Sequence, residues 1–386
     1  MIKIVFNPHR DPAAVPAHWG EAPGRAFHQG IPAYAPTPLH PLPALARTLG
    51  LAQVWVKDES KRFGLNAFKG LGGSWAMGRY LCQKRGIPAD ERAFLRLKEG
   101  QEAPITFLTT TDGNHGRGVA WAARELGQKA VVHMPAGTVA ERLENIRALG
   151  AQADILPMNY DEAVRRSAQE AEEKGYVLIQ DTAWPGYEEI PACIMEGYAT
   201  LAWEIEEALT RQGGEKPTHL FLQAGVGSLA GAAAAYFAAR WGAQSPQVIV
   251  VEPAAADCHF RTAAADDGTL HAVTGAMNST MAGLCCGEVN VLSWPLLRAA
   301  ASAFLSCSDA VTEAGMRLLG RPGPGDPAIV SGESGAVTAG ALAALMTDPA
   351  LAQARTALGL DAGARVLLIS TEGDTDRVHY QAVLQG

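Results

Sequence analysis

The sequence predicts an α/β protein built on parallel sheets wrapped by helices. Two observations predict it: short β-branched runs alternate with single helices from about residue 104, and a second alternation follows residue 189. Strands joined by single helices pair as parallel neighbours, with right-handed crossovers that place the helices on the sheet faces. With 386 residues the chain is long enough for two or three domains.

The first alternation predicts a small α/β domain at residues 76–189, set within a larger discontinuous domain of residues 1–75 and 190–386. Its expected strands are 105–110, 130–134, 153–156 and 176–179. The helices between these strands are expected at 119–126, 138–150 and 161–174. The spacing of Thr138 and Glu141 predicts a capping box for the second helix, and Asp161 is expected to cap the third.

The second alternation belongs to the larger domain. Its expected elements are a helix at 189–212, a strand at 219–223, an alanine-rich helix at 229–241, and strands at 248–251 and 366–369. We interpret residues 254–293 as loop-rich and residues 295–346 as helical, with a glycine break at 331–335. Ahead of both alternations, residues 7–43 are expected to form an extended arm without a core of its own, and residues 54–57 a strand.

Composition and charge exclude several classes of function. The net charge of −8 and the pI near 5.7 argue against a nucleic-acid partner, and no block of Lys and Arg suggests one. Neither a signal peptide nor an apolar run long enough to span a bilayer is recognisable, so we expect a cytoplasmic protein without a membrane partner. The six cysteines show no metal-ligand spacing, so we expect no metal site, and free thiols are the base expectation. If a disulfide forms, the candidate pairing is Cys258 with Cys285 or Cys286.

Lys69 lies in the stretch Asn66–Ser74, a lysine among glycines at the start of a predicted helix. Taken alone, such a lysine does not differ from a solvated side chain. Phe68 and Leu71 flank it, however, and apolar surroundings lower the pKa of a lysine and make its amine nucleophilic. The glycines are poor helix residues, so we expect something bulky to approach closely, such as an aldehyde cofactor bound to the amine.

Two loops at the ends of predicted strands carry further candidate groups. Gln223–Gly231 follows a strand and opens a helix, and its glycines leave main-chain N–H groups free to bind a phosphate. With Glu252 ending the next strand, the loop also resembles a dinucleotide site, and a glycine turn needed only for packing is a third interpretation. Thr109–Gly116 lies at another strand's carboxyl end. An N-cap role explains Asp112 or Asn114 alone, but not both beside two glycines.

In order and spacing these motifs resemble the fold-type II pyridoxal-phosphate enzymes, the superfamily of the tryptophan synthase β subunit, over nearly the whole chain. Within that superfamily the chain is most similar to the diaminopropionate ammonia-lyases. The matching strings are K-D-E-S-x-R-F-G-L-N-A-F-K (Lys57–Lys69), T-D-G-N-H-G-R-G (Thr111–Gly118) and Q-D-T-A-W (Gln180–Trp184). The resemblance implies two open, twisted, mostly parallel sheets flanked by helices, an active site between a large and a small domain, and a homodimer.

The resemblance also implies a role for each candidate residue. Lys69 would form the Schiff base with pyridoxal 5'-phosphate, Asn114 would contact the phenolic oxygen, and Thr371 would bond the ring nitrogen. The phosphate would lie on the main-chain amides of Gly225, Val226, Gly227, Ser228 and Leu229. Because a neutral hydroxyl cannot keep the ring nitrogen protonated, the ring would be a weaker electron sink, which favours β-elimination over transamination.

Asp112 departs from the serine and threonine dehydratases, which the resemblance implies carry a small hydroxyl residue there. A carboxylate at that point repels an α-carboxylate, so it fits a substrate with a second amino group, or the need for a second base. Lys69 and Asp112 would then remove the α-proton of opposite enantiomers. Asp181 is a second acidic candidate or a turn former, and Thr111 and His115 are candidate substrate ligands.

The expected function is therefore the pyridoxal-phosphate-dependent α,β-elimination of D- or L-2,3-diaminopropionate, a small amino-acid substrate, to pyruvate and two molecules of ammonia. A serine or threonine dehydratase is the nearest alternative. An NAD-dependent oxidoreductase that uses the glycine loop and a non-enzymatic ligand-binding module are alternatives from other classes.

Overall fold

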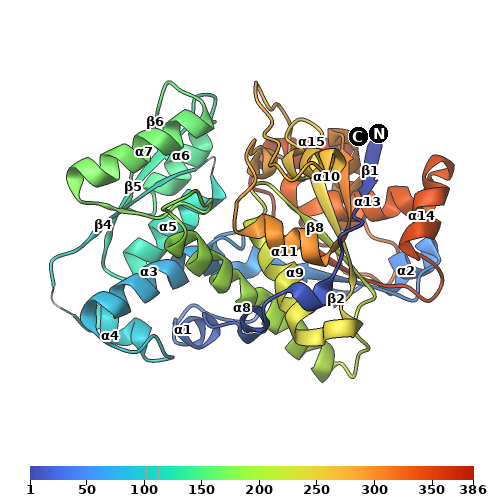
Figure 1. Cartoon of the computed structure of the whole chain (residues 1–386), viewed down its shortest axis with the longest axis horizontal. Helices are drawn as coiled ribbons and strands as arrows, with labels where there is room; N and C mark the ends of the chain where they lie inside the picture. Colours follow the sequence, from blue (N-terminus) through green and yellow to red (C-terminus); the bar gives the residue numbers. More distant parts are fainter. Residues whose placement is uncertain (101, 112) are drawn as a thin grey trace. The chain divides into compact units, whose positions relative to one another are not determined.

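Two β-sheets organise the part of the chain that the structure describes, one in each of two compact units (Figure 1). This computed structural model describes residues 1–100, 102–111 and 113–386. The larger unit comprises Met1–Glu21, Pro36–Ala67 and Leu201–Gly386, and the smaller unit comprises Ala22–Ala35 and Phe68–Thr200. The small domain expected at residues 76–189 falls inside the smaller unit.

The sheet of the smaller unit has the strand order β6-β5-β4-β7, with every pairing parallel. Its strands are β4 (Thr106–Thr110), β5 (Lys129–Met134), β6 (Gln152–Ile155) and β7 (Val177–Leu178). The crossover helices are α5 (Asn114–Glu125), α6 (Ala140–Arg147) and α7 (Tyr160–Lys174). The unit also contains α1 (Arg25–Gln29), α3 (Gly70–Arg85) and α4 (Ala93–Glu99). The first alternation predicted from the sequence is thereby confirmed.

The sheet of the larger unit has the order β1-β10-β9-β8-β11-β3-β2. Its edge strands, β1 (Ile2–Phe6) and β2 (Leu39–Pro41), pair antiparallel. The strands between them are parallel: β3 (Gln53–Asp58), β8 (His219–Gln223), β9 (Gln247–Pro253), β10 (Ala301–Cys307) and β11 (Arg365–Ser370). The expected mostly parallel α/β architecture is confirmed.

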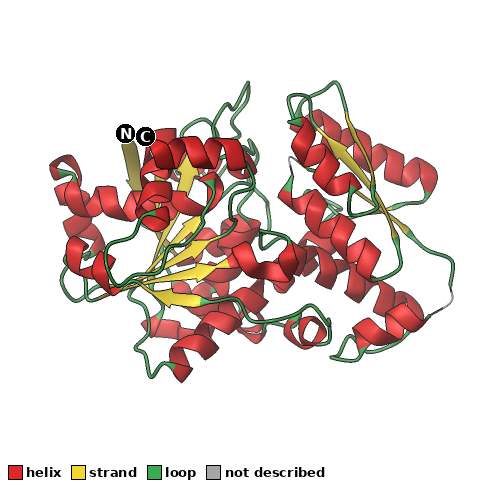
Figure 2. Ribbon diagram, turned by 180° about the vertical axis from the view of Figure 1, so that it is seen from behind, coloured by secondary structure: helices red, strands yellow, loops and turns green. Residues whose placement is uncertain are grey.

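Helices cover both faces of the larger sheet (Figure 2). They are α2 (Pro43–Leu49), α9 (Ser228–Trp241), α10 (Cys258–Ala265), α11 (Ser293–Ala300), α12 (Asp309–Gly320), α13 (Glu333–Thr347), α14 (Ala352–Leu358) and α15 (Arg377–Gln385). The long helix α8 (Glu189–Arg211) begins in the smaller unit and ends in the larger one. A core of aliphatic side chains, including Phe221, Leu342 and Val366, lies between the sheet and its helices.

The sequence predicts helix throughout residues 295–346, whereas Ala301–Cys307 forms strand β10. Its residues A-S-A-F-L-S-C include good helix formers, so the local propensity is misleading. All of them are buried, and the strand pairs with β1 on one side and β9 on the other. Pairing on both edges with burial on both faces outweighs the local preference for helix.

Helix starts also differ from those expected. The predicted capping box of Thr138 and Glu141 is wrong, because the Thr138 hydroxyl donates to the Pro135 carbonyl at 2.9 Å and the N-cap residue of α6 is Val139, whose side chain makes no capping hydrogen bond. Helix α7 is capped by Asn159, and Asp161 lies in its first turn. Asn and Asp are both good capping residues, so the sequence does not distinguish between neighbouring candidates two positions apart.

The sequence predicts an N-terminal arm without a core, but part of the arm packs into one. Ala22–Ala35 belongs to the smaller unit, where Phe27 of α1 is fully buried. Its ring centroid lies 5.8 Å from that of Trp75 and 6.2 Å from that of Phe94. An aromatic cluster of this kind supplies the apolar burial that a proline-rich segment lacks by itself.

A buried ion network joins the segment after β3 to α8 within the larger unit. Glu204 contacts Lys57 at 2.6 Å and Arg62 at 2.7 Å, and Arg62 also pairs with Glu59 at 2.8 Å. All of these side chains are inaccessible to solvent. Burial raises the pKa of Glu204, but its two cationic neighbours outweigh burial and lower that pKa to about 2. This network accounts for three residues of the Lys57–Lys69 motif, Lys57, Glu59 and Arg62, and it fixes the chain shortly before Lys69.

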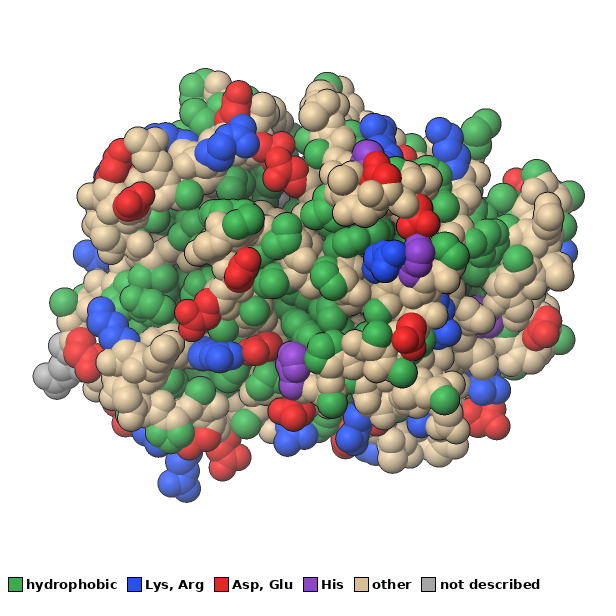
Figure 3. Space-filling model, in the orientation of Figure 1, with side chains coloured by type: hydrophobic (Ala, Val, Ile, Leu, Met, Phe, Trp, Pro, Cys, Tyr) green, Lys and Arg blue, Asp and Glu red, His purple; other side chains and the backbone are tan. Residues whose placement is uncertain are grey.

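Each of the six cysteines is a free thiol, and the candidate disulfide is not formed. The Cys258 sulfur instead lies 3.7 Å from the main-chain oxygen of Cys286. Within the described ranges no single helix has the length and apolar composition to cross a membrane; Glu333–Thr347 and Pro349–Leu358 meet that test only as a pair bent by 88°. On the face shown in Figure 3, acidic and basic side chains are interspersed.

Candidate active site

Lys69 lies at the N-cap of α3, in the smaller unit. Its amine forms an ion pair with the Asp181 carboxylate. The ring centroids of Phe68 and Tyr198 lie 5.4 Å and 6.0 Å from the same amine. The side chain of Lys69 is 18% exposed, so the ion pair is largely screened from water while the amine stays reachable. The partly apolar surroundings predicted for Lys69 are confirmed, and the ring of Tyr198 is an additional apolar contact.

Asp181 follows β7 and is almost inaccessible, with 6% of its side chain exposed. Burial alone raises the pKa of a carboxyl group, but His115 and Lys69 outweigh burial and lower the pKa of Asp181 to about 2. The ring of His115 is fixed because its Nε2 donates to the Ile179 carbonyl at 2.8 Å, and its Nδ1 lies 3.7 Å from Asp181. Lys69, His115 and Asp181 therefore form one cluster, with Asp181 as its permanent anion.

The glycines around Lys69 serve helix packing. A Cβ atom at Gly118 of α5 would lie 2.9 Å from the main-chain carbonyl of Lys69. One at Gly72 would lie 2.6 Å from the Tyr198 ring, and one at Gly197 of α8 would lie 2.7 Å from the Leu71 oxygen. Of the glycines that follow Lys69, Gly72 confirms the expected close approach, and the approaching group is the Tyr198 ring of α8.

The T-D-G-N-H-G loop connects β4 to α5. Thr111 is buried, and its hydroxyl accepts a hydrogen bond from the Gly113 amide at 2.9 Å. Asn114 is the first residue of α5, a helix whose N-terminal amides favour an anion such as a carboxylate. Asp112, the candidate second base, lies outside the described residues.

In the larger unit the glycine loop connects β8 to α9. Gly227 has a left-handed backbone with φ of +94°, and α9 begins at the next residue, Ser228. A Cβ atom at Gly227 would lie 2.3 Å from Nε2 of His259, so the loop admits glycine alone there. The Asn290 side-chain amide donates to the Ser228 hydroxyl at 2.8 Å and its main-chain amide donates to the Val226 carbonyl at 2.9 Å. The loop is thus held in one shape with its helix N-terminus available to an anion.

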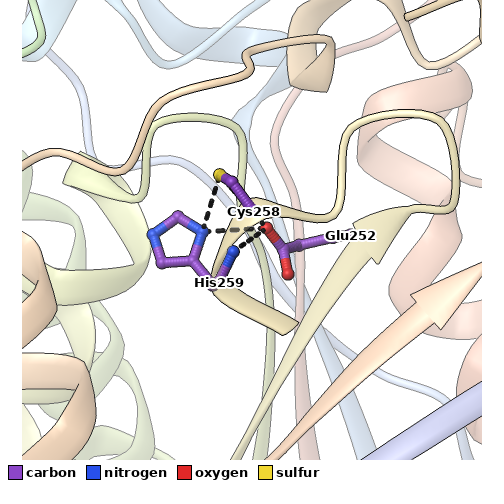
Figure 4. A group of neighbouring side chains, drawn as sticks. All are labelled: Glu252, Cys258 and His259. Atoms are coloured by element: carbon purple, nitrogen blue, oxygen red, sulfur yellow. Dashed lines mark hydrogen bonds and ion pairs between the residues drawn. The ribbon is translucent and has the colours of Figure 1, made fainter. Parts of the chain in front are cut away.

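A buried group of side chains lies under the glycine loop (Figure 4). Glu252 accepts hydrogen bonds from Nδ1 of His259 at 2.8 Å, from the His259 amide at 2.9 Å and from the Phe260 amide at 2.7 Å. Cys258 lies beside them, 3.7 Å from a Glu252 oxygen, and burial raises the pKa of its thiol well above the ordinary value. Because both oxygens of Glu252 are engaged in capping α10, this carboxylate is not available to a ribose hydroxyl.

Thr371 directly follows β11, the neighbour of β8, and its side chain is buried. Its hydroxyl oxygen accepts a hydrogen bond from the Gln223 side-chain amide at 2.9 Å. Thr371 and the glycine loop therefore lie at the carboxyl ends of adjacent parallel strands, the usual ligand position in an open sheet.

Sequence reasoning did not single out Tyr198. Its phenol is fully buried, and burial raises its pKa, so the ring remains neutral beside Lys69. The signal that could have revealed it is the preceding Gly197, since a glycine inside a long apolar helix marks a close approach.

Comparison with known proteins identifies relatives over nearly the full length. Residues 31–372 match the family described as pyridoxal-phosphate dependent enzymes. The diaminopropionate ammonia-lyase of Salmonella typhimurium is 50% identical over 364 residues, which cover 93% of this chain and 90% of that enzyme. The crystal structure of the Escherichia coli diaminopropionate ammonia-lyase in complex with D-serine superposes with a TM-score of 0.93 at 46% identity, covering 100% of this chain and 97% of that one. The same enzyme in complex with an aminoacrylate-PLP azomethine reaction intermediate gives a TM-score of 0.91, also at 46% identity, covering 100% of this chain and 97% of that one.

Proposed function

The chain belongs to the pyridoxal-phosphate dependent enzymes, and from that membership we propose that it is a diaminopropionate ammonia-lyase. It converts 2,3-diaminopropionate and water to pyruvate and two molecules of ammonia. The observation that carries the proposal is the Lys69–Asp181 pair at a helix N-terminus, in a chain half identical to enzymes of that activity. A lysine held by a buried carboxylate, with aromatic walls and partial access, is equipped to bind an aldehyde and to move a proton.

The residues of the larger unit fit the phosphate and ring of pyridoxal phosphate. The amides of Gly225 to Leu229 open α9, and Nε2 of His259 is buried beside this loop without a hydrogen-bond partner among the described residues. A fixed helix N-terminus with unobstructed glycine amides suits a phosphate dianion. Thr371 offers a hydroxyl to the ring nitrogen. For Asn114 and Lys69, the family resemblance supports roles as the partner of the phenolic oxygen and of the aldehyde carbon.

Bound pyridoxal phosphate supplies an electron sink for the charge left at Cα when the α-proton is removed. The chain supplies the proton transfers. Lys69 takes the α-proton of one enantiomer, and the neighbouring Asp181 anion stabilises the ammonium that forms. The β-nitrogen, present as an ammonium, needs no further proton and leaves as ammonia, while Lys69 retains the α-proton. The released enamine hydrolyses to pyruvate and the second ammonia.

Asp112 completes the proposal as the base for the other enantiomer and as the anion facing the substrate's second ammonium. This role rests on the sequence, because Asp112 lies outside the described residues. Thr111 and the first amides of α5 would bind the α-carboxylate, and His115 would orient Asp181. Enantiomers present the α-proton on opposite faces of the cofactor, so an enzyme that uses both needs two bases.

Individual residues argue against each of the alternative functions. An NAD-dependent oxidoreductase requires an acid for the ribose, and Glu252 is engaged in capping α10. The substrates of a serine or threonine dehydratase carry a β-hydroxyl in place of a β-ammonium, so they offer Asp112 no second cation to face. A binding module has no need of Lys69 beside Asp181.

The experiment is an assay of pyruvate from D-diaminopropionate, L-diaminopropionate and serine, with the wild type, Lys69→Ala and the exposed-lysine control Lys61→Ala. We expect diaminopropionate to be the faster substrate, Lys69→Ala to lose activity by several orders of magnitude, and Lys61→Ala to match the wild type. Faster turnover of serine would indicate the dehydratase. A yellow chromophore that is lost on borohydride reduction and leaves a label on Lys69 would exclude the oxidoreductase, and a protein without such a chromophore would exclude the lyase.

We further propose a cytoplasmic homodimer. The superfamily resemblance supports the dimer, and the free cysteines are typical of a reducing compartment. Light scattering during size-exclusion chromatography distinguishes a dimer of 40.6 kDa chains from a monomer.

A further inference from the structure

Gln223 is the last residue of β8, and its buried side chain faces oxygen atoms. Its Nε2 lies 3.0 Å from the Ser334 carbonyl, 2.9 Å from the Ile369 carbonyl and 2.9 Å from the Thr371 hydroxyl oxygen. Carbonyl oxygens only accept hydrogen bonds, so the amide end that faces them must be the nitrogen. The orientation of this amide is therefore fixed by its surroundings.

That orientation fixes the direction of the Thr371 hydroxyl. A hydroxyl has a single hydrogen and two lone pairs, and toward the N–H groups of Gln223 it acts as an acceptor. Its own hydrogen must then point away from Gln223. Within the described parts of the chain Thr371 donates this hydrogen to no other group, so it is left for a ligand.

The remaining contacts of Gln223 prevent its amide from turning. Its hydrogens are shared between the Ser334 carbonyl at the start of α13, the Ile369 carbonyl in β11, and Thr371. The Gln223 oxygen is buried and has no hydrogen-bond partner among the described residues. An unpaired buried oxygen is unfavourable, so we attribute the presence of glutamine at position 223 to the hydrogen bonds that its amide N–H groups donate.

We propose that Gln223 is a positioning residue that makes Thr371 a hydrogen-bond donor to the pyridine nitrogen of the bound cofactor. The inference rests on the proposed function, because it takes Thr371 as the partner of that nitrogen. A nitrogen that accepts a hydrogen bond uses its lone pair and stays unprotonated. The ring is thereby held in its weaker electron-withdrawing form, which suits rapid elimination of a β-amino group.

Gln223 acts through Thr371, so its test needs a measurement other than turnover. The wild type, Thr371→Val, Gln223→Met and Gln223→Asn are reconstituted with pyridoxal phosphate labelled with ¹⁵N in the ring. The ¹⁵N resonance is recorded from pH 6 to pH 9, because protonated and unprotonated ring nitrogens resonate far apart. Met keeps the length of Gln without its donors, and Asn keeps the amide but withdraws it from Thr371 by one methylene group.

For the wild type we expect an unprotonated, hydrogen-bonded nitrogen whose signal is constant across this pH range. Thr371→Val should move the signal to that of an unbonded nitrogen. Either Gln223 variant frees Thr371 to accept as well as donate, so the signal should move toward the protonated position as the pH falls. A protonated nitrogen in the wild type, or Gln223 variants indistinguishable from it, would overturn the proposal.

The two proposals fail separately. If Thr371→Val leaves the ¹⁵N signal unchanged while diaminopropionate is still converted to pyruvate, Gln223 has no such role and the lyase assignment stands. If the wild type binds no labelled cofactor, the proposed function itself is wrong.

Discussion

Replacing Asp181 by Asn should destabilise the cofactor-free protein in a pH-dependent manner. The pKa of Asp181 is lowered from 3.8 to about 2 in the folded chain. The unfolded chain therefore takes up the proton first, so the carboxylate stabilises the fold fully above pH 3.8 and loses that effect as the pH falls through about 2. At about 1.36 kcal/mol per pKa unit, the stabilisation is about 2 kcal/mol at pH 7 and about half of that at pH 3.

The assay is urea unfolding of the wild type and Asp181→Asn at pH 7, 5 and 3, followed by tryptophan fluorescence. The difference between the two unfolding free energies should be equal at pH 7 and pH 5 and should halve at pH 3. Asp90→Asn is the matched control, because Asp90 pairs with Arg96 at the solvent-exposed surface of the same unit, where water screens the charges. Equal stability of Asp181→Asn and the wild type at pH 7, or a difference that does not change down to pH 3, would refute the reasoning.

Three further outcomes are expected. Gly118→Ala should lower the free energy of unfolding by about 1–3 kcal/mol and weaken cofactor binding, because the added Cβ would lie 2.9 Å from the Lys69 carbonyl. Gly73→Ala is the control and should be tolerated, because its Cβ would make only an ordinary contact at 3.4 Å. Thermal unfolding and cofactor titration compare the two variants. Glu204→Gln should lower the free energy of unfolding by about 3–5 kcal/mol at pH 7, measured by urea unfolding, because the buried cations Lys57 and Arg62 lose their carboxylate partner. Cys258 should react with a thiol reagent at pH 8 only after unfolding, because burial raises its pKa; mass spectrometry of labelled peptides checks this.

The strands could be predicted where burial and local pattern agree. All residues of β8 are buried, and its apolar centre, residues 220–222, lies between Pro217 and a glycine-rich loop, so the position of the strand follows from the sequence. Strand β10 could not be predicted, because Ala301–Cys307 has the composition of a helix and becomes a strand only between two partners distant in sequence.

The sequence proposes the residues of the candidate site, but it does not indicate their contacts. Lys69 and Asp181 are 112 positions apart, and no local pattern indicates that they form an ion pair. The glycines near Lys69 correctly signal close approach, yet the approaching ring of Tyr198 comes from a different helix. Gln223 is a further example, because its importance depends on β11 lying beside β8. Such pairings follow from topology, which a single sequence specifies only through the complete fold.

The most direct test of the central claim is the stoichiometry of products from each enantiomer of 2,3-diaminopropionate. The wild type should release two molecules of ammonia for each pyruvate from at least one enantiomer, and Lys69→Ala should release neither product. If the wild type forms no pyruvate from either enantiomer, or forms pyruvate with one ammonia from serine alone, the chain is not a diaminopropionate ammonia-lyase.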